Sequence, residues 1–404
     1  MSVRINPDIF RSYDIRGIYN RDFDVSFAEE FGNKVALALQ AKTLVIGRDR
    51  RVSSDALEKA LVQGVILAGV RVLEIGECTT PSFYYSVHAK QSEGGIMITA
   101  SHNPQEYNGF KVVGPDGNII GGDQLRMIYL NTASSRAGAG AVEAYDGIGE
   151  YAKTVSRIGG SAENTFAIGV NGPRANEKIL NKIGEKTALL IQKSNGSGLE
   201  VSFDGDADRI SFFDRRKRVD ADFIALLVIM SRGYKKIIYD FRCSRAVREQ
   251  FEKLGITAIP AKVGRLNVYE NMRNYDADFG FEITGHFYLK DFNYLESPET
   301  VLLWVRQIIQ KEGKNLGELI KPYDRYFRSG ELSYPLNSRA FALIEEHYAN
   351  GRINRDDGIL IEYDDWWFNL RASNTEPVMR LVVEAKNVEL LNHKVQELEA
   401  MLKH

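Results

Sequence analysis

The chain has 404 residues, 44% of them hydrophobic and 26% charged, and a formal net charge of −2. This length predicts two to four domains, and the composition is that of a soluble globular protein. The near-neutral charge gives no indication of a general nucleic-acid binder or of an acidic tail, while the 52 Lys and Arg residues leave local basic sites open.

Strand and helix signals alternate in the first part of the chain. Thr43–Ile46 is a short apolar run and predicts a buried strand. Ser53 and Ser54 offer an N-cap for a helix with apolar residues at helical spacing, which Gly69 ends. Val70–Ile75 predicts the next strand, so this stretch is expected to form a βαβ unit with parallel pairing.

The alternation continues beyond a weaker stretch. Asn131–Gly160 is rich in Ala, Gly and Ser and predicts the end of a helix followed by a linker, with a domain boundary there. Asp222–Ser231 predicts an apolar helix. Lys236–Asp240 and Ile256–Ile259 predict strands on either side of a helix at Arg245–Leu254.

The last part of the chain has a different pattern. Gly358–Tyr363 and Trp366–Leu370 predict two strands around a turn, and Val378–Glu384 predicts a third. The chain closes with an amphipathic helix whose apolar face would carry Val388, Leu391, Val395, Leu398 and Leu402.

Cysteine content and hydropathy indicate the compartment. The two cysteines, Cys78 and Cys243, lie far apart in sequence, and a chain of this size needs no disulfide scaffold, so a reduced compartment is expected. Met1–Pro7 lacks a long apolar run, and no stretch approaches the length of a membrane span. We therefore expect a cytoplasmic protein without a signal peptide, and with no membrane or nucleic-acid partner.

The segment Thr99–Pro104 contains a candidate nucleophile, Ser101. It follows the strand-like run Gly95–Ile98, and a small hydroxyl residue at a strand end, beside His102, suits an exposed nucleophile. Such a serine needs a base or a metal to become reactive, or it carries a phosphate and acts as a donor. Taken alone, the segment is better interpreted as a Ser/Asn/Pro turn.

Three carboxylates alternate with small residues after the apolar Val201 and Phe203: these are Asp204, Asp206 and Asp208. Alternate carboxylates can converge on one hard cation, and magnesium takes oxygen ligands while keeping positions open for phosphate. Without a cation the carboxylates would repel one another. The spacing excludes an EF-hand. The small spacers favour a metal site over an exposed acidic turn.

The segment Gly280–His286 contains groups suited to a sugar. Glu282 can accept hydrogen bonds from two sugar hydroxyls, and Thr284 and His286 can add more. Alone, a Glu–His pair in a turn is more often structural.

The segment Arg371–Pro377 contains groups suited to a phosphate. Arg371 offers a fork for phosphate oxygens, and hydroxyl and backbone N–H donors follow it. A polar hairpin turn is an equally good interpretation of this segment in isolation.

Two basic residues could carry protons or stabilise developing negative charge. Arg16 stands in an expected tight loop, Tyr13–Gly17, and Lys111 follows the Ser101 loop. As single residues, each is more often a solvated surface charge.

Together and in this order, the four segments resemble the α-D-phosphohexomutase family, and within it the phosphomannomutase/phosphoglucomutase branch. The resemblance covers nearly the whole chain, Phe10–Glu384. It implies an α/β architecture with four domains around a central cleft: three related mixed-sheet α/β domains and a smaller C-terminal α+β domain. The expected domains are 1–147 with the phosphoserine loop, 148–219 with the metal-binding loop, 220–325 with the sugar-binding loop and 326–404 with the phosphate-binding loop.

The resemblance also implies roles for individual residues. Ser101 would be the phosphoserine and, together with Asp204, Asp206 and Asp208, a magnesium ligand. The other residues that match catalytic positions are Arg16, His102, Lys111 and Arg209. Those that match substrate-binding positions are Tyr13, Arg242, Arg265, Glu282, Thr284, His286, Arg371, Ser373, Asn374 and Thr375.

The implied activity is that of an isomerase that interconverts hexose 1-phosphate and hexose 6-phosphate. The phosphoserine would give its phosphoryl group to a substrate hydroxyl, and the hexose 1,6-bisphosphate would turn over and return the other phosphoryl group to Ser101. Mg²⁺ and the bisphosphate are the implied cofactors, and small hexose phosphates the partners, with monomer and dimer both open. Asn374 resembles the mannose/glucose mutases, whereas glucosamine mutases more often have Gly there, and the segment Phe287–Asp291 resembles phosphomannomutases. The resemblance therefore favours mannose phosphate, with glucose phosphate close behind and phosphoglucosamine mutase as an alternative.

Several positions depart from the family pattern. Asn171 stands where members usually have Asp, the region 121–204 is shorter than usual, and Glu296–Pro298 lacks the acidic-plus-glycine pattern. Arg242 replaces a family Lys, which keeps the charge but changes its geometry. Arg265 stands where members often have His, so this change bears on substrate handling.

Three rival functions stay open. A non-catalytic homologue that only binds sugar phosphates is motivated by the short region and by Arg265, but the intact Ser101 and acidic triplet argue against it. A phosphatase would result if water intercepted the phosphoserine. An aspartyl-phosphate phosphatase with Asp204 as nucleophile would leave Ser101, Glu282 and the Arg371 loop without roles.

Overall fold

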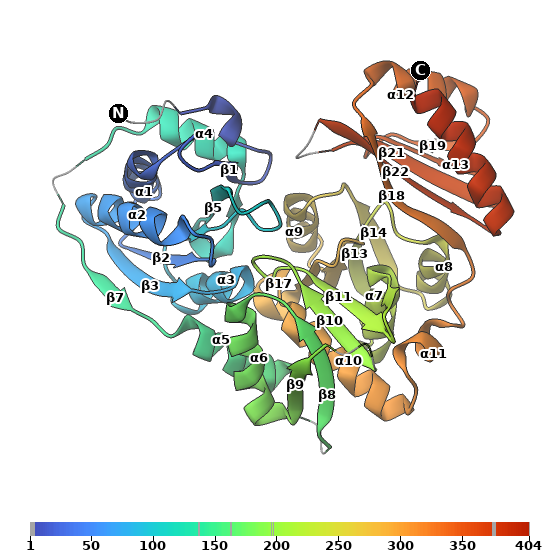
Figure 1. The fold of residues 1–404 in the computed structure, drawn as a ribbon, viewed down its shortest axis with the longest axis horizontal. Coiled ribbons are helices and arrows are strands. Elements are labelled where there is room, and N and C mark those ends of the chain that lie inside the picture. Colours follow the sequence, from blue (N-terminus) through green and yellow to red (C-terminus); the bar gives the residue numbers. More distant parts are fainter. Residues whose placement is uncertain are drawn as a thin grey trace. The chain divides into compact units, whose positions relative to one another are not determined.

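The computed structural model describes residues 5–403 except 136–137, 162–163, 195, 197 and 374–376 (Figure 1). The chain divides into two compact units, Met1–Val219 with Gly285–Asn315, and Asp220–Thr284 with Leu316–His404. Both units combine helices with sheets, so the predicted mixed α/β class is confirmed. The domain boundaries at 147, 219 and 325 stay predictions. Within the described residues, none of the helices combines the length and hydropathy needed to cross a membrane.

The first sheet of the first unit has the strand order β1-β5-β4-β2-β3-β7, with β6 beside β5. The strands β2, β3, β4 and β7 are parallel, whereas β5 pairs antiparallel with β1, β4 and β6. The predicted βαβ unit is therefore confirmed. The strands are β1 (Ile15–Ile18), β2 (Thr43–Arg48), β3 (Arg71–Glu77), β4 (Gly95–Ile98), β5 (Tyr107–Val113), β6 (Ile119–Ile120) and β7 (Val142–Ala144).

The helices of this layer bury their apolar sides in one core. Residues of α1 (Val25–Ala38), α2 (Ser54–Leu67) and α4 (Gly122–Asn131) pack with the sheet strands in a single cluster, while α3 (Thr80–Ala89) also contacts β2 and β4. The rings of Phe27 and Phe31 stack 5.5 Å apart, and both lie against Phe110 of β5. Burial of such side chains contributes roughly 2–3 kcal/mol each and holds β5 in place.

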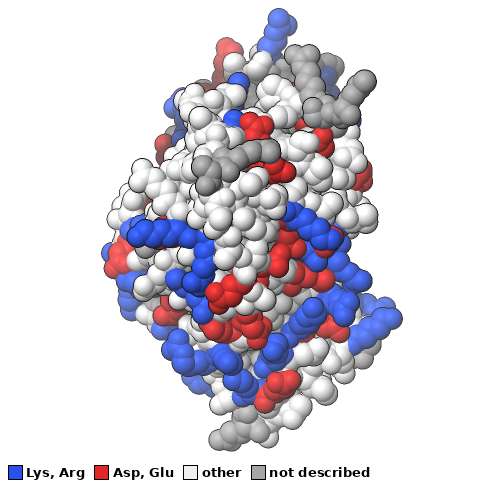
Figure 2. Space-filling view, turned by 90° about the vertical axis from the view of Figure 1, so that its left-hand side faces the viewer, with Lys and Arg blue, Asp and Glu red and all other residues white. Residues whose placement is uncertain are grey.

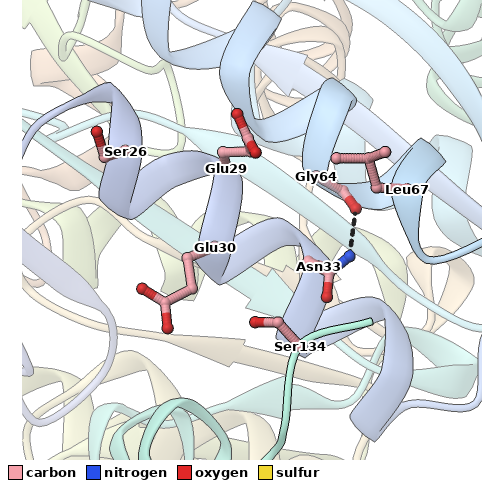
Figure 3. A pocket seen from close by; sticks show the side chains of 7 residues that line it. All are labelled: Ser26, Glu29, Glu30, Asn33, Gly64, Leu67 and Ser134. Carbon is pink, nitrogen blue, oxygen red and sulfur yellow. Dashed lines mark hydrogen bonds between the residues drawn. The ribbon is translucent and has the colours of Figure 1, made fainter. Parts of the chain in front are cut away.

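A polar cavity of about 380 Å³ lies where α1 and α2 meet (Figure 3). Asn33 on α1 donates hydrogen bonds to the carbonyl oxygens of Gly64 and Ser135, at 2.9 and 2.8 Å. Glu30 pairs with Lys34 one turn later. These contacts tie the end of the α4 segment to the helix pair, so the polar lining has a structural role.

The second sheet of this unit has the order β12-β11-β10-β8-β9. The strands are β8 (Phe166–Asn171), β9 (Leu189–Lys193), β10 (Leu199–Phe203), β11 (Ile210–Asp214) and β12 (Lys217–Val219), and α6 (Arg174–Thr187) joins β8 to β9. The unit is completed by the antiparallel pair β16 (Phe287–Leu289) and β17 (Leu295–Glu296) and by α10 (Pro298–Glu312).

The prediction of a linker over Asn131–Gly160 was wrong in its second half. Besides β7, the stretch contains the helix α5 (Gly147–Gly159), which packs against α3, α6 and α10. Its Ile148, Tyr151, Ala152 and Val155 recur at helical spacing and are buried. The small residues that suggested a linker allow close packing instead, since a Cβ on Gly159 would overlap the side chain of Leu303.

The second unit begins with a parallel α/β layer. The strands β13 (Lys236–Asp240), β14 (Thr257–Ala261) and β15 (Phe279–Phe281) are parallel, with β13 in the middle. The helices are α7 (Ala221–Arg232), α8 (Arg245–Lys253), α9 (Arg265–Asn274) and α11 (Leu316–Ile320). The predicted elements of this stretch are confirmed to within two residues.

An antiparallel sheet closes the second unit, in the order β18-β22-β21-β20-β19. The strands are β18 (Phe327–Pro335), β19 (Arg352–Asn354), β20 (Ile359–Glu362), β21 (Trp366–Ala372) and β22 (Val378–Ala385), with helices α12 (Ser338–His347) and α13 (Val388–Leu402). The predicted apolar face of α13 packs on the sheet through Leu391, Leu398 and Leu402. Val388 is 42% exposed, so its assignment to that face was wrong, because it lies at the first turn of the helix, beyond the edge of the core.

Candidate active site

Ser101 lies in the loop that follows β4 and is 98% buried. Its backbone has φ = 50°, a left-handed conformation that is uncommon outside glycine. The N–H of Ser101 donates to Oγ1 of Thr99 at 2.9 Å. Such strain costs on the order of 1–3 kcal/mol and persists only where the surroundings hold it, which is typical of functional sites.

The carboxylates of Asp204, Asp206 and Asp208 converge in the loop between β10 and β11, with candidate ligand atoms within 4.8 Å of one another. Ala207 has φ = 57°, which bends the loop so that alternate side chains meet. Ser101 Oγ donates to Asp204 Oδ2 at 3.1 Å. The structure therefore brings together the predicted nucleophile and the predicted metal ligands, 103 residues apart in sequence.

A glycine is required at position 205, where the acidic loop approaches the loop of Ser101. A Cβ on Gly205 would overlap the carbonyl oxygen of Ser101. The backbone of the acidic loop thus lies against the peptide group of Ser101, the predicted nucleophile, and a displacement of one loop would move the other.

The charges of the three convergent carboxylates favour binding of a cation. Burial, with Asp208 and Asp206 close by, raises the pKa of Asp204 to about 7. Burial and the charge of Asp208 also act to raise the pKa of Asp206, but the ammonium group of Lys111 outweighs them, so the pKa of Asp206 is lowered. Lys111 Nζ lies 2.5 Å from Asp206 Oδ2 and 2.6 Å from Asp208 Oδ2. A divalent ion would add positive charge where the three carboxylates still repel one another.

One oxygen of Asp206 fits a metal ligand in particular. Its Oδ2 accepts hydrogen bonds from Lys111 and from Oγ1 of Thr80, the latter at 2.6 Å. Its Oδ1 is buried and accepts no hydrogen bond from any of the residues that the structure describes. A buried carboxylate oxygen without a donor is destabilising unless a cation or a water binds it, so the residues fit a hard cation.

Thr80, at the start of α3, fixes the orientation of this carboxylate. Besides the side-chain bond, its N–H donates to the carbonyl oxygen of Asp206 at 2.9 Å. We predict that Thr80→Val, which keeps the shape but removes the donor, lowers the affinity for Mn²⁺ or Mg²⁺ by about 10-fold, since groups that orient metal ligands typically contribute this much. Calorimetric titration of the purified protein measures the change.

Thr154→Val is the matched control for Thr80→Val. The hydroxyl of Thr154 bonds Tyr85 at 2.8 Å in the same unit, away from the carboxylates. Equal metal affinities for the Thr80 and Thr154 variants would contradict the prediction.

Arg16 belongs to a strand and not to the predicted tight loop. It lies in β1, because the buried Ile15 pairs with Phe110 of β5. Its guanidinium group binds Asp14 at 2.8 Å and Oδ1 of Asn103 at 2.7 Å. Arg16 therefore faces the loop of the nucleophile, while Tyr13 lies half-buried just before β1.

His102 is neutral at pH 7. Burial, with additional repulsion from Arg209 and Arg16, lowers its pKa to about 4. Its Nδ1 lies 3.4 Å from Ser101 Oγ. A neutral imidazole can accept the hydroxyl proton, so this geometry suits a proton acceptor.

Arg209 connects the acidic loop to His286. Its N–H donates to Asp204 Oδ1 at 3.3 Å, and its Nε donates to Nε2 of His286 at 2.9 Å. The Nδ1 of His286 lies 3.4 Å from Glu296 Oε1. The structure therefore places His286 beside the acidic loop of the first unit, whereas Glu282 and Thr284, with which it was grouped in the sequence, belong to the second.

A cavity of about 630 Å³ borders this group of residues. It is lined among others by Ser101, His102, Asn103, Asp204 and Arg174. Its size lies within the range of roughly 300–1,000 Å³ that small-molecule sites have.

The second unit holds the predicted sugar and phosphate residues. Glu282 is buried after β15 and accepts a hydrogen bond from the N–H of Gly264 at 2.9 Å, just before Arg265 at the start of α9. Thr284 Oγ1 is buried and has no hydrogen-bond partner among the described residues. Such a hydroxyl is available to a ligand.

Two buried arginines face one carboxylate that the sequence did not indicate. Arg242 binds Asp240 at 2.7 Å and Glu331 at 2.5 Å, and Nη2 of Arg371 lies 3.4 Å from the same Glu331 oxygen. Burial and the neighbouring Arg242 lower the pKa of Arg371. The N–H of Ser373 donates to the carbonyl oxygen of Val378 at 2.8 Å.

The remaining predicted phosphate-loop residues, Asn374 and Thr375, lie outside the described residues. Glu331 gives no sequence signal, because a single Glu in an amphipathic strand is common.

A protein with several α/β layers, a strained buried serine and three convergent carboxylates has the groups of a phosphoryl-transfer enzyme. Family models for phosphoglucomutase/phosphomannomutase match three stretches: alpha/beta/alpha domain I over residues 7–138, alpha/beta/alpha domain III over 221–326 and the C-terminal domain over 337–401.

Individual relatives extend these matches over nearly the whole chain. The chain is 30% identical over 438 residues to a phosphomannomutase of Methanocaldococcus jannaschii, covering 98% of this chain and 97% of the relative. It is also 30% identical over 455 residues to a phosphomannomutase of Escherichia coli K12, covering 97% and 98%. The chain therefore belongs to the phosphoglucomutase/phosphomannomutase family of α-D-phosphohexomutases, which are isomerases.

Solved structures share the fold. A phosphoglucomutase/phosphomannomutase family protein from Burkholderia thailandensis superposes with a TM-score of 0.88 at 22% identity, covering 99% of this chain and 98% of that one. The N-acetylphosphoglucosamine mutase of Aspergillus fumigatus, solved with GlcNAc-6P and magnesium, has a TM-score of 0.58 at 14% identity, covering 80% and 92%.

Proposed function

We propose that this phosphohexomutase is a phosphomannomutase that interconverts mannose 1-phosphate and mannose 6-phosphate, with Ser101 as the phosphoryl carrier. The observation that carries the proposal is the 3.1 Å contact between Ser101 Oγ and Asp204 Oδ2, inside a cluster of three carboxylates. The relatives named phosphomannomutase support mannose over other hexoses. The expected location is the cytoplasm.

We infer that the acidic cluster binds Mg²⁺. Asp204, Asp206 and Asp208 would hold the ion together with the phosphate carried by Ser101, and the bare Oδ1 of Asp206 supports this assignment. When bound, Mg²⁺ supplies positive charge against the oxygens of the transferred phosphoryl group. The magnesium in the solved Aspergillus mutase supports the choice of ion.

The residues around Ser101 suit transfer in both directions. After transfer the free hydroxyl is held by Asp204 Oδ2 and by the neutral imidazole of His102, which can take up its proton. The charges of Arg16, Lys111 and Arg209 act on the carboxylates of the acidic loop, and these positive charges offset those of a phosphoryl group.

Residues of the second unit suit groups of a sugar phosphate. The carboxylate of Glu282 and the buried hydroxyl of Thr284 suit sugar hydroxyls, and Arg242, Arg265 and Arg371 suit the phosphate that does not react. Ser373, and by resemblance Asn374 and Thr375, would complete the phosphate loop. The hexose 1,6-bisphosphate is the proposed intermediate, and a variant of the Aspergillus mutase has been solved with glucose 1,6-bisphosphate.

A substrate panel tests the proposal. The purified protein, primed with a hexose 1,6-bisphosphate and Mg²⁺, is assayed with mannose 1-phosphate, glucose 1-phosphate and glucosamine 1-phosphate. We expect the highest kcat/KM for mannose 1-phosphate and a strong requirement for Mg²⁺. Preference for glucosamine 1-phosphate would replace the assigned substrate. If a protein phosphorylated on Ser101 turned over none of the three, the result would favour a sugar-phosphate-binding homologue. Release of inorganic phosphate would favour a phosphatase.

A further inference from the structure

Arg51 makes an unusually complete set of hydrogen bonds beside the nucleophile. It follows β2 in the loop before α2 and is 7% exposed. Its Nη1 donates to the carbonyl oxygens of Pro104 and Tyr107, at 2.6 and 3.1 Å. Its Nη2 donates to those of Ser101 and Asn103, both at 2.7 Å. Four carbonyl groups of the segment 101–107 thus converge on one guanidinium group.

Asp49 uses the remaining donor of Arg51 and links it to the other side of Ser101. Arg51 Nε donates to Asp49 Oδ2 at 3.1 Å, and the same oxygen accepts from the hydroxyl of Thr99 at 2.7 Å. Thr99 Oγ1 in turn accepts the N–H of Ser101. The peptide groups on both sides of Ser101 are therefore bound to one buried ion pair, through Thr99 at its N–H and through Arg51 at its carbonyl.

This anchoring explains how a non-glycine residue keeps φ = 50° at the nucleophile. The conformation is strained, so the loop would relax if its carbonyl groups lost their donors. The Ser101 carbonyl is also the group against which Gly205 packs. Movement of that carbonyl would shift Ser101 Oγ relative to Asp204, and a displacement of about 1 Å at a reacting atom can lower a rate about 100-fold.

We propose that Arg51 is a positioning residue for phosphoryl transfer, which holds the Ser101 loop in its strained conformation through the carbonyl groups of that loop. The proposal rests on the proposed function of Ser101. A lysine cannot replace Arg51, because its ammonium group has three donors at one point, whereas the four carbonyls and Asp49 need a planar fork with five.

Arg306 offers a matched control in the same unit. It is fully buried, and it donates to the carbonyl oxygens of Thr187 and Gly160, at the C-terminal ends of α6 and α5. Its removal deletes a buried guanidinium group with carbonyl partners but leaves the nucleophile's loop untouched.

The test compares Arg51→Lys and Arg51→Ala with Arg306→Ala in the mutase assay with Mg²⁺ and bisphosphate, with each rate taken per folded molecule. We expect kcat to fall about 100-fold in Arg51→Ala and at least about 10-fold in Arg51→Lys, with KM within about threefold of the wild type. Arg306→Ala should keep the wild-type kcat. Guanidinium ion, below its denaturing range, should restore part of kcat in Arg51→Ala, and tetramethylammonium should not.

Several results would overturn the positioning role. These are a wild-type kcat in both Arg51 variants, a loss confined to KM, a kcat loss in Arg306→Ala equal to that in Arg51→Ala, or no rescue by guanidinium ion. If Arg51→Ala does not fold, the kcat of Arg51→Lys decides alone. A wild-type protein without mutase activity on any hexose phosphate would instead contradict the proposed function, so the two failures are distinguishable.

Discussion

Replacing Ser101 with alanine is expected to lower mutase activity by at least about 10⁴-fold and to remove the phosphoryl group from the purified protein. The buried hydroxyl contacts Asp204 Oδ2 at 3.1 Å and His102 Nδ1 at 3.4 Å. Because this hydroxyl is the proposed phosphoryl carrier, the loss should appear in kcat. Intact-mass measurement and a mutase assay with added bisphosphate check both parts.

The control for this substitution is Ser92→Ala. Ser92 is buried in the same unit, and its hydroxyl lies within hydrogen-bond distance of the carbonyl oxygens of Gly94 and Val87, at 3.0 and 3.3 Å, away from the carboxylates. It should keep both the activity and the phosphoryl mass. Ser101→Thr should be nearly as inactive as Ser101→Ala, because a β-branched residue is a marked outlier at φ = 50°. Substantial mutase activity in Ser101→Ala would disprove the phosphoserine mechanism.

The parts of this site that sequence could predict are those encoded within a few residues. Asp204, Asp206 and Asp208 alternate along one segment, so their convergence in a turn follows from local geometry. Thr80 and Arg51 gave no such signal. Thr80 acts on a carboxylate 126 residues away and Arg51 on a carbonyl 50 residues away. The first pairing exists only after α3 has packed against the acidic loop between β10 and β11, and the second only after β2 and β4 have paired.

The same distinction applies to the fold. The βαβ unit with β2 and β3 was predictable, because each strand is a buried apolar run and Gly69, at φ = 85°, ends the helix between them. Helix α5 was missed because its glycines lower helix propensity, while its stability comes from burial of Ile148 and Tyr151 in contacts with distant segments. The strand at Arg16 was missed because four residues show too little alternation, and its pairing with β5 decides its conformation.

Replacing Arg328 with methionine is expected to lower the free energy of unfolding by about 3–5 kcal/mol, because it leaves two buried carboxylates without their cation. Arg328 lies in β18, and its Nη2 binds Asp222 Oδ2 on α7 at 2.7 Å, while its Nε lies 3.5 Å from Glu384 Oε2 on β22. Both carboxylates are almost fully buried. Burial alone would lower the pKa of Arg328, but the two carboxylates raise it above its ordinary value. The charges of this cluster therefore stabilise one another.

A double variant separates this charge effect from a simple packing defect. Glu384 Oε1 accepts hydrogen bonds from the backbone N–H of Arg245 and from Nε1 of Trp367, at 2.8 and 2.7 Å, and these bonds survive in Glu384→Gln. Arg328→Met with Glu384→Gln should therefore unfold at a higher urea concentration than Arg328→Met alone, since one uncompensated charge is gone.

The exposed pair of Arg352 with Asp364 provides the contrast, because pairs at the surface contribute little to stability. Arg352→Met should unfold close to the wild-type urea midpoint. Equal midpoints for Arg328→Met and Arg352→Met would show that the buried cluster does not hold β18 and β22 to α7. A midpoint for the double variant below that of Arg328→Met would show that loss of packing, and not unpaired charge, destabilises the single variant.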